Sequence, residues 1–134
     1  MPRIQGRCGI WEVCVFAVTD YTLAKRALLR QVRTSVVSRL DVCDAHPELL
    51  RAAKNVGEGT GASCPLCGRK SLRLVTYVFG DGLKNDSGRV WPRNRVGELL
   101  DRTDELACYV VEVCVECCWN HLVRSFLLGR RNAG

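Results

Sequence analysis

The sequence predicts an α+β fold, in which a small antiparallel three-stranded zinc ribbon is joined to an N-terminal helical half. Three observations predict this class. Two Cys-x-x-Cys pairs lie in the C-terminal part, segments rich in β-branched residues flank them, and residues 19–37 carry a helical apolar period. The chain has 134 residues, so we expect one compact domain.

The N-terminal part is predicted to be helical over residues 17–60, after an extension of residues 1–16 that shows no clear period. A first helix is expected from about Thr19 to Val37, because apolar residues recur there at steps of three and four. Thr19 or Asp20 can cap this helix, since their side-chain oxygens accept from the free amides of the first turn.

A second helix is expected from about Pro47 to Val56. Proline suits the first helical position, where its missing N–H removes no hydrogen bond. Gly57 can end the helix in the left-handed conformation, and the glycine-rich residues 57–63 are predicted to connect the helical half to the metal half.

The metal half is predicted to span residues 61–130. Its three strands are expected at residues 71–79, 108–113 and 119–127, where β-branched and aromatic side chains are frequent. A helical insertion near residues 96–106, with leucines facing inward, would account for the long segment between the two cysteine pairs.

The most informative motif is the pair Cys64-x-x-Cys67 followed by Cys114-x-x-Cys117. Two residues between cysteines let a tight turn direct both thiolates at one ion, and two such turns complete a tetrahedron. Gly68 can adopt the positive φ that such a knuckle requires. Four thiolates without an open position predict one structural zinc ion, although ligand type alone leaves an iron–sulfur cluster open.

Other cysteines and both histidines are open to more than one interpretation. Cys118 is adjacent to a ligand and is expected to point away, while His121 could replace a cysteine, support a ligand or be structural. Cys43-x-x-His46 has ligand-like spacing but no partner pair. We therefore expect His46 to cap the helix that begins at Pro47, and Cys43 to be a small buried apolar residue.

Three stretches of the sequence carry a resemblance to a known family. They are Val42-Cys-Asp-Ala-His-Pro-Glu-Leu-Leu-Arg-Ala-Ala53, Cys64-Pro-Leu-Cys67, and Val110-Val-Glu-Val-Cys-Val-Glu-Cys-Cys-Trp-Asn-His-Leu122 with Ser125-Phe126. Over residues 18–130 the chain resembles an uncharacterised actinobacterial family of small zinc-ribbon-like proteins, a domain of unknown function. The resemblance implies a zinc ribbon and a bacterial cytosolic setting but no activity. Cys118 stands where glycine is expected.

The basic charge favours an anionic partner, and the alternative is a solvated surface in an organism whose proteins are rich in arginine. The net charge is +6, and arginine supplies 16 of the 20 basic residues. Arginine binds phosphates through two parallel hydrogen bonds, so nucleic acid is the expected partner. The candidate residues are Arg26, Arg30, Arg33, Arg69, Lys70, Arg73, Arg89, Arg93 and Arg95. Trp91 would either stack on a base or anchor its loop to the core.

The sequence contains no phosphate-binding loop, nucleophile elbow or zinc-protease motif, so we expect no enzyme. The leading hypothesis is a non-catalytic zinc-ribbon protein that associates with nucleic acid or a nucleoprotein machine, either RNA polymerase or the ribosome. The alternatives are a protein adaptor with a structural zinc, and a thiol-based redox or metal sensor that uses Cys118. The odd cysteine count and the lack of a signal or membrane span predict a cytoplasmic protein without membrane contact.

Overall fold

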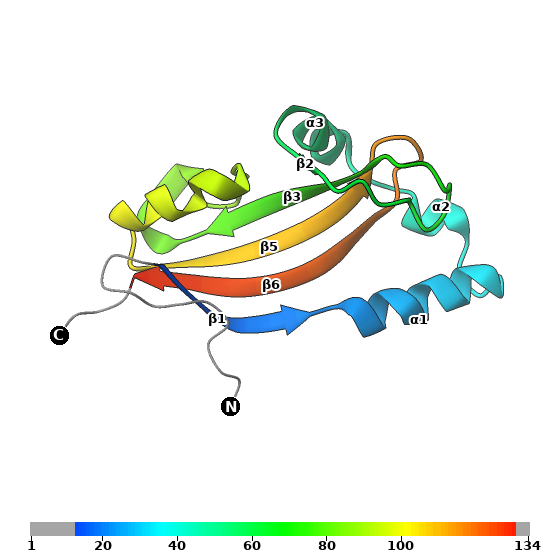
Figure 1. The fold of residues 1–134 in the computed structure, drawn as a ribbon, viewed down its shortest axis with the longest axis horizontal. Coiled ribbons are helices and arrows are strands. Elements are labelled where there is room, and N and C mark those ends of the chain that lie inside the picture. The colour runs from blue at the N-terminus through cyan, green and yellow to red at the C-terminus, as the bar shows by residue number, and fades with distance from the viewer. Residues whose placement is uncertain (1–12, 131–134) are drawn as a thin grey trace.

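The computed structural model describes residues 13–130, so most of the predicted extension over residues 1–16 lies outside the described residues. The fold is an antiparallel sheet with helices packed toward its two ends (Figure 1). In chain order the elements are β1 (Val13–Asp20), α1 (Thr22–Arg33), α2 (Arg39–Val42), α3 (Pro47–Asn55), β2 (Glu58–Gly59), β3 (Leu72–Phe79), the 3-10 helix η1 (Asp81–Asp86), β4 (Arg89–Val90), the 3-10 helix η2 (Arg93–Asp101), β5 (Glu105–Cys114) and β6 (Asn120–Arg130).

The α+β class is confirmed, but the prediction of a three-stranded ribbon is wrong. The described residues form a six-stranded sheet in the order β1-β6-β5-β3-β2, with β4 also paired to β3. The three predicted strands are present as β3, β5 and β6. The sheet is larger because β1 adds to the outer edge of β6, with Val15 opposite Leu128, and the short strands β2 and β4 both pair with β3.

Helix α1 is shorter than the sequence predicts. The predicted start near Thr19 is wrong, because Thr19 and Asp20 belong to β1 and the helix begins at Thr22. Tyr21 occupies the N-cap position without a side-chain hydrogen bond, while Asp20, one residue earlier, accepts from the backbone N–H of Thr22 at 2.7 Å. The helix ends at Arg33, because Ser35 has a φ of 64° and takes the chain out of the helical region. Val36 was expected to continue the apolar period of this helix, but it lies outside the helix and is 72% exposed.

Helix α3 begins at Pro47 as predicted, and Nδ1 of His46 accepts from the backbone N–H of Glu48 at 3.1 Å. Its end differs from the prediction, because Gly57 is not in the left-handed region. A side chain at Gly57 would instead place a Cβ atom 2.3 Å from the carbonyl oxygen of Ala53. Arg73 closes this end by donating to the carbonyl oxygens of Ala53 and Gly57, both at 2.6 Å.

The helix predicted near residues 96–106 is the 3-10 helix η2, which spans Arg93–Asp101. Leu99 and Leu100 are buried as expected, whereas Leu106 belongs to β5 and is buried in the sheet. Trp91 packs against the same cluster, which favours its role as an anchor of the loop.

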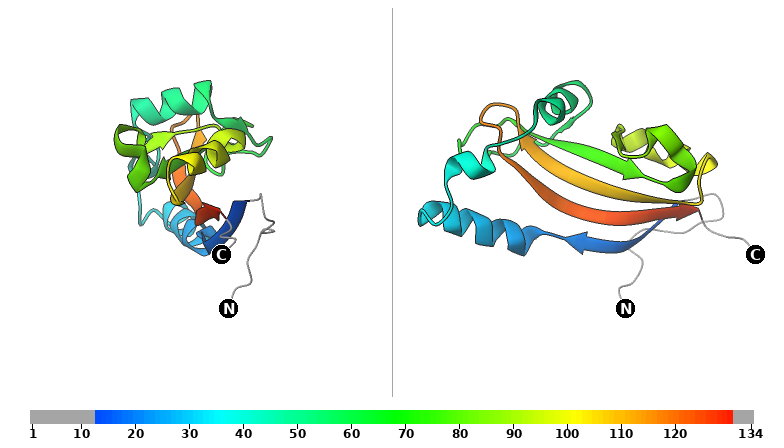
Figure 2. Two further views of the ribbon diagram at one scale, coloured as in Figure 1. Left: turned by 90° about the vertical axis from the view of Figure 1, so that its left-hand side faces the viewer. Right: turned by 180° about the vertical axis from the view of Figure 1, so that it is seen from behind.

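The helices pack toward opposite ends of the sheet. Figure 2 shows α1, α2 and α3 toward one end and the 3-10 helices at the other. Because side chains alternate along a strand, Leu72 and Val75 of β3 lie on opposite faces. Leu72 packs with residues of α1 and α2, and Val75 packs with residues of α3, so both faces at this end are covered.

A buried polar network attaches α1 to the sheet. Glu112 of β5 is only 7% exposed, and its carboxylate accepts from Trp119 Nε1 at 2.7 Å. The other partner is Lys25 of α1, whose Nζ lies 2.8 Å from the same carboxylate. A buried carboxylate requires such partners, because its desolvation is otherwise uncompensated. This network therefore fixes where α1 crosses the sheet.

We expect Lys25→Met to lower the free energy of unfolding by about 2 kcal/mol, because Glu112 would keep a buried charge without its cation. Arg69→Met is the matched control: it breaks the exposed ion pair between Arg69 and Glu116 and should cost less than about 1 kcal/mol. Urea unfolding of the metal-loaded proteins measures both values. If both variants lowered the free energy of unfolding equally, the contact between Lys25 and Glu112 would not stabilise the packing of α1 on the sheet.

Candidate metal centre

Four cysteine thiols converge at one end of the sheet. The Sγ atoms of Cys64, Cys67, Cys114 and Cys117 all lie within 4.8 Å of one another. The separation between Cys64 and Cys117 is 3.7 Å, and that between Cys67 and Cys114 is 3.6 Å. A tetrahedral ion with metal–sulfur bonds of about 2.3 Å holds its sulfur ligands about 3.8 Å apart. The four predicted ligands are therefore positioned to bind one metal ion.

The two cysteine pairs form turns with the same backbone hydrogen bonds. The N–H of Gly68 donates to the carbonyl oxygen of Cys64, and the N–H of Cys118 donates in the same way to Cys114. The N–H of the first cysteine of each pair donates to the carbonyl oxygen of the residue five positions later. The acceptor is Arg69 for Cys64 and Trp119 for Cys114. The repeated geometry is that of two knuckles, and each one presents two sulfurs to the same point.

Each knuckle has a left-handed residue at the same position, immediately after its second cysteine. Gly68 has a φ of 78°, which glycine adopts without steric cost. Cys118 has a φ of 72° at the equivalent position of the second knuckle. A Cβ atom in this region is strained, so Cys118 carries a cost that Gly68 avoids. The expectation of glycine at position 118 thus has a conformational basis.

Burial and hydrogen bonds to sulfur shift the pKa values of three of the four thiols. Burial raises the pKa of Cys114, but donation by the Ser71 hydroxyl, 3.0 Å from Sγ, and by backbone amides of its knuckle lowers it to about 6. Burial raises the pKa of Cys64 and of Cys117. Before metal binding, Cys114 is thus more readily available than Cys64 or Cys117 as a thiolate, which is the form that binds metal.

Apolar side chains from the helical half enclose the centre. Leu28, Leu29 and Val32 of α1 and Val42 of α2 belong to the cluster that contains the ligands, and Trp119 is fully buried in it. An ion pair between Arg69 and Glu116, at 3.0 Å, joins the two knuckles on the exposed side. The end of the sheet that carries the four cysteines, which we call the metal end, is therefore where the sheet packs against α1 and α2.

Cys43 lies closer to the centre than the sequence indicates. Its Sγ is 3.8 Å from Sγ of Cys117, and it is partly exposed. The loop that carries it is fixed by a hydrogen bond from the N–H of Ala45 to the carbonyl oxygen of Cys118 at 3.1 Å. Cys43 is thus a fifth thiol beside one ligand. It packs against the buried apolar cluster as expected, but it is only partly buried. The Cys43-x-x-His46 spacing was the available signal.

Cys118 and His121 are not members of the four-sulfur group. The ring of His121 stacks on Trp119 with a centroid separation of 5.8 Å, and its Nδ1 lies 2.7 Å from the carbonyl oxygen of Leu122. These contacts favour the structural interpretation of His121.

The predicted nucleic-acid residues fall into three sets. Some are engaged within the protein: Arg73 at the end of α3, and Arg69, Arg89, Arg93 and Arg95 in ion pairs. Lys70 is exposed beside the first knuckle. Arg26, Arg30 and Arg33 are exposed on α1, and within residues 13–130 none of these three forms an ion pair. The structure therefore groups only the three α1 arginines on one exposed surface, which we call the α1 arginine face.

A family model and several mycobacterial proteins match this chain. A family described as "Family of unknown function (DUF5318)" matches residues 6–134. Uncharacterized proteins of Mycobacterium bovis and Mycobacterium tuberculosis are 46% identical over 110 residues, which cover 82% of this chain and 80% of theirs. No solved structure matches this chain.

Within residues 13–130, no helix has the length and apolar character needed to cross a membrane.

We expect Cys117→Ser to abolish stoichiometric metal binding, because one of four converging sulfurs is lost. Cys43→Ser should retain one ion per chain, since Cys43 is not one of the four thiols whose sulfurs lie within 4.8 Å of one another. Elemental analysis of both purified variants and of the unaltered protein measures the ratio of metal to chain. If Cys117→Ser kept the metal ion and Cys43→Ser lost it, then Cys43 and not Cys117 would be the fourth ligand, and the assignment would be wrong.

We expect opposite effects from changing the residue after each knuckle. Gly68→Ala should destabilise the metal-loaded protein by about 1 kcal/mol, because its φ is unfavourable for any residue with a Cβ atom. No atom lies within 4 Å of that Cβ position, so the effect isolates the backbone. Cys118→Gly should be neutral or stabilising for the same reason. Chemical unfolding measures both, and a stable Gly68→Ala protein would contradict the strain argument.

Proposed function

The chain therefore belongs to the family of unknown function DUF5318, and we propose that it is a non-catalytic zinc protein that binds nucleic acid or a nucleoprotein complex of transcription or translation. The metal is proposed to be zinc, because four thiolates in a closed tetrahedral set are typical of structural zinc sites. The ion would have no open position for a substrate. Its role would be to join the two knuckles and to stabilise the packed helices.

The observation that carries the binding role is the α1 arginine face. Arg26, Arg30 and Arg33 are spaced by four and three residues, so they lie along one side of the helix. The opposite side of α1 packs on the metal end through Leu28, Leu29 and Val32. Three guanidinium groups without carboxylate partners would thus be presented on a helix held by the metal centre, which is suited to phosphate contacts.

A second candidate is a protein adaptor, which a different observation favours. Leu23, Val36 and Leu40 are 76%, 72% and 82% exposed, and they lie in the same part of the chain as the α1 arginine face. Exposed apolar side chains near arginine are common in protein interfaces. The two candidates differ in salt dependence, because phosphate contacts weaken steeply with salt and apolar contacts do not.

We expect the metal-loaded protein to bind duplex DNA or RNA with an affinity that falls linearly with salt on logarithmic axes. The double variant Arg30→Ala/Arg33→Ala should reduce the slope of that line by about two, one for each lost phosphate contact. Fluorescence anisotropy of labelled nucleic acid over a salt series measures the slope.

Arg51→Ala/Lys54→Ala is the matched control, because it also removes two exposed basic residues from a helix, in this case α3. It should leave the slope nearly unchanged. Binding that is absent, insensitive to salt, or weakened equally by both double variants would reject the nucleic-acid proposal and leave the adaptor. Elemental analysis of the same samples tests the identity of the metal.

A further inference from the structure

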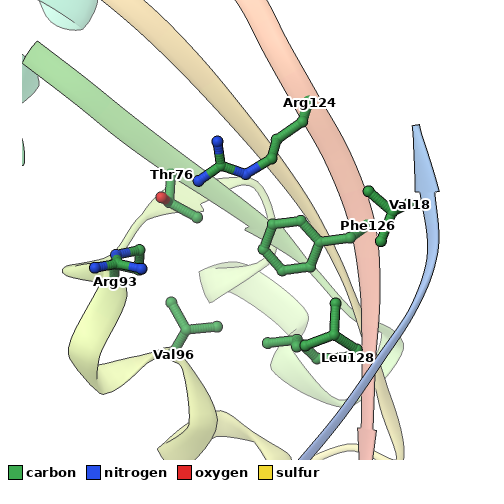
Figure 3. A pocket seen from close by; sticks show the side chains of 8 residues that line it. Val18, Thr76, Arg93, Val96, Arg124, Phe126 and Leu128 are labelled. Carbon is green, nitrogen blue, oxygen red and sulfur yellow. The ribbon is translucent and has the colours of Figure 1, made fainter. Parts of the chain in front are cut away.

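A pocket lies away from the metal centre, between η2 and the strands. Its volume is about 460 Å³, within the range of cavities that hold small molecules. The walls come from β1, β3, η2 and β6 (Figure 3). None of the four metal ligands lines it. The pocket is thus a separate site that the proposed nucleic-acid function does not use.

One part of the pocket is apolar. Val15 and Val18 of β1, Val96 of η2, and Phe126 and Leu128 of β6 supply this wall. Figure 3 shows Phe126 and Leu128 on the side of the pocket nearest β1, with Val96 across from them. A hydrocarbon body placed there would remove these side chains from water, which is favourable in proportion to the area covered.

The remaining lining is polar and cationic. Thr76 of β3 is only 5% exposed, and within residues 13–130 its hydroxyl group forms no hydrogen bond, although its carbonyl oxygen accepts from the N–H of Trp91. Arg124 of β6 and Arg93 of η2 complete this part. In the view of Figure 3, Thr76 lies between the two guanidinium groups. A hydroxyl in the pocket lining without a protein partner leaves a donor and an acceptor open to a ligand.

Arg124 is the more informative of the two arginines. It is partly buried, and within the described chain it forms no ion pair. Asp20 lies opposite it in the β1–β6 register. Hydrogen bonds from Thr22 lower the pKa of the Asp20 carboxyl most and the charge of Arg124 lowers it further, but Arg124 forms no hydrogen bond to this exposed carboxylate. Arg93 pairs with Glu58 at 3.2 Å, in an exposed pair that is easily exchanged. Both guanidinium groups are therefore available to an anion at the polar part of the pocket.

We propose that this pocket binds a small organic carboxylate with an apolar body, of the chemical class of a medium-chain fatty acid. The carboxylate accepts hydrogen bonds from the guanidinium groups of Arg124 and Arg93 and from the hydroxyl of Thr76. The apolar body packs against Val96, Phe126 and Leu128. Planar guanidinium groups match the two oxygens of a carboxylate, which gives this end its specificity.

The test uses the metal-loaded protein, labelled with ¹⁵N, and octanoate as the probe. Octanoate should shift the amide signals of residues 93–96 and 124–128 in a saturable manner. Arg124→Gln should weaken the binding at least tenfold, because a charged hydrogen-bonding partner is lost. Arg51→Gln removes the same charge from the exposed face of α3 and should leave the affinity unchanged.

1-Octanol and acetate separate the two parts of the pocket. Octanol retains the apolar body without the charge, and acetate retains the charge without the body, so each should bind much more weakly than octanoate. If Arg124→Gln does not fold, Arg93→Gln tests the same contact. Absence of saturable octanoate shifts, equal binding of octanol, or unchanged affinity in the arginine variants would overturn the proposal.

Discussion

The convergence of four sulfur atoms on one point is the constraint on which the metal end of this structure depends. The register between β3 and β5 places Leu72 opposite Cys114, so the knuckle before β3 meets the knuckle after β5. A shift of one residue would turn the side chains of a strand to the other face and separate the thiols. Sheet pairing and metal binding therefore stabilise each other, and the ion would add its binding energy only to this one register.

The helical half depends on the same end of the sheet for its position. Helix α1 packs on the ligand cluster through its leucines, and Lys25 reaches the buried carboxylate of Glu112. No residue of α1 is fully buried, so the helix has little core of its own. A short helix of this kind gains its stability from tertiary packing. The packing at the cysteine end of the sheet thus also determines where the α1 arginine face is presented.

Local rules predicted the parts of the fold whose signals lie close together in sequence. The cysteine spacings correctly predicted that four thiols converge, and Pro47 with its cap His46 and the β-branched run of β3 were also interpreted correctly. The rest required tertiary information. Strand β1 forms because β6 offers it an edge about a hundred residues further along the chain, and Cys43 approaches Cys117 only after its loop docks on the second knuckle. Propensity and spacing carry no signal for such pairings.

The arginines show why a charge count alone is a weak guide to function. Arg73 closes α3, Arg69 joins the knuckles, and Arg93 with Arg124 lines a pocket. These guanidinium groups are therefore engaged in structure or in a small cavity, although each adds equally to the net charge. The α1 arginine face combines exposure, helical alignment and lack of carboxylate partners among the described residues, and it has three such charges where Arg51 and Lys54 of α3 supply two. Since steering depends on unpaired surface charge, this face is where the proposed attraction of a polyanion would act most directly.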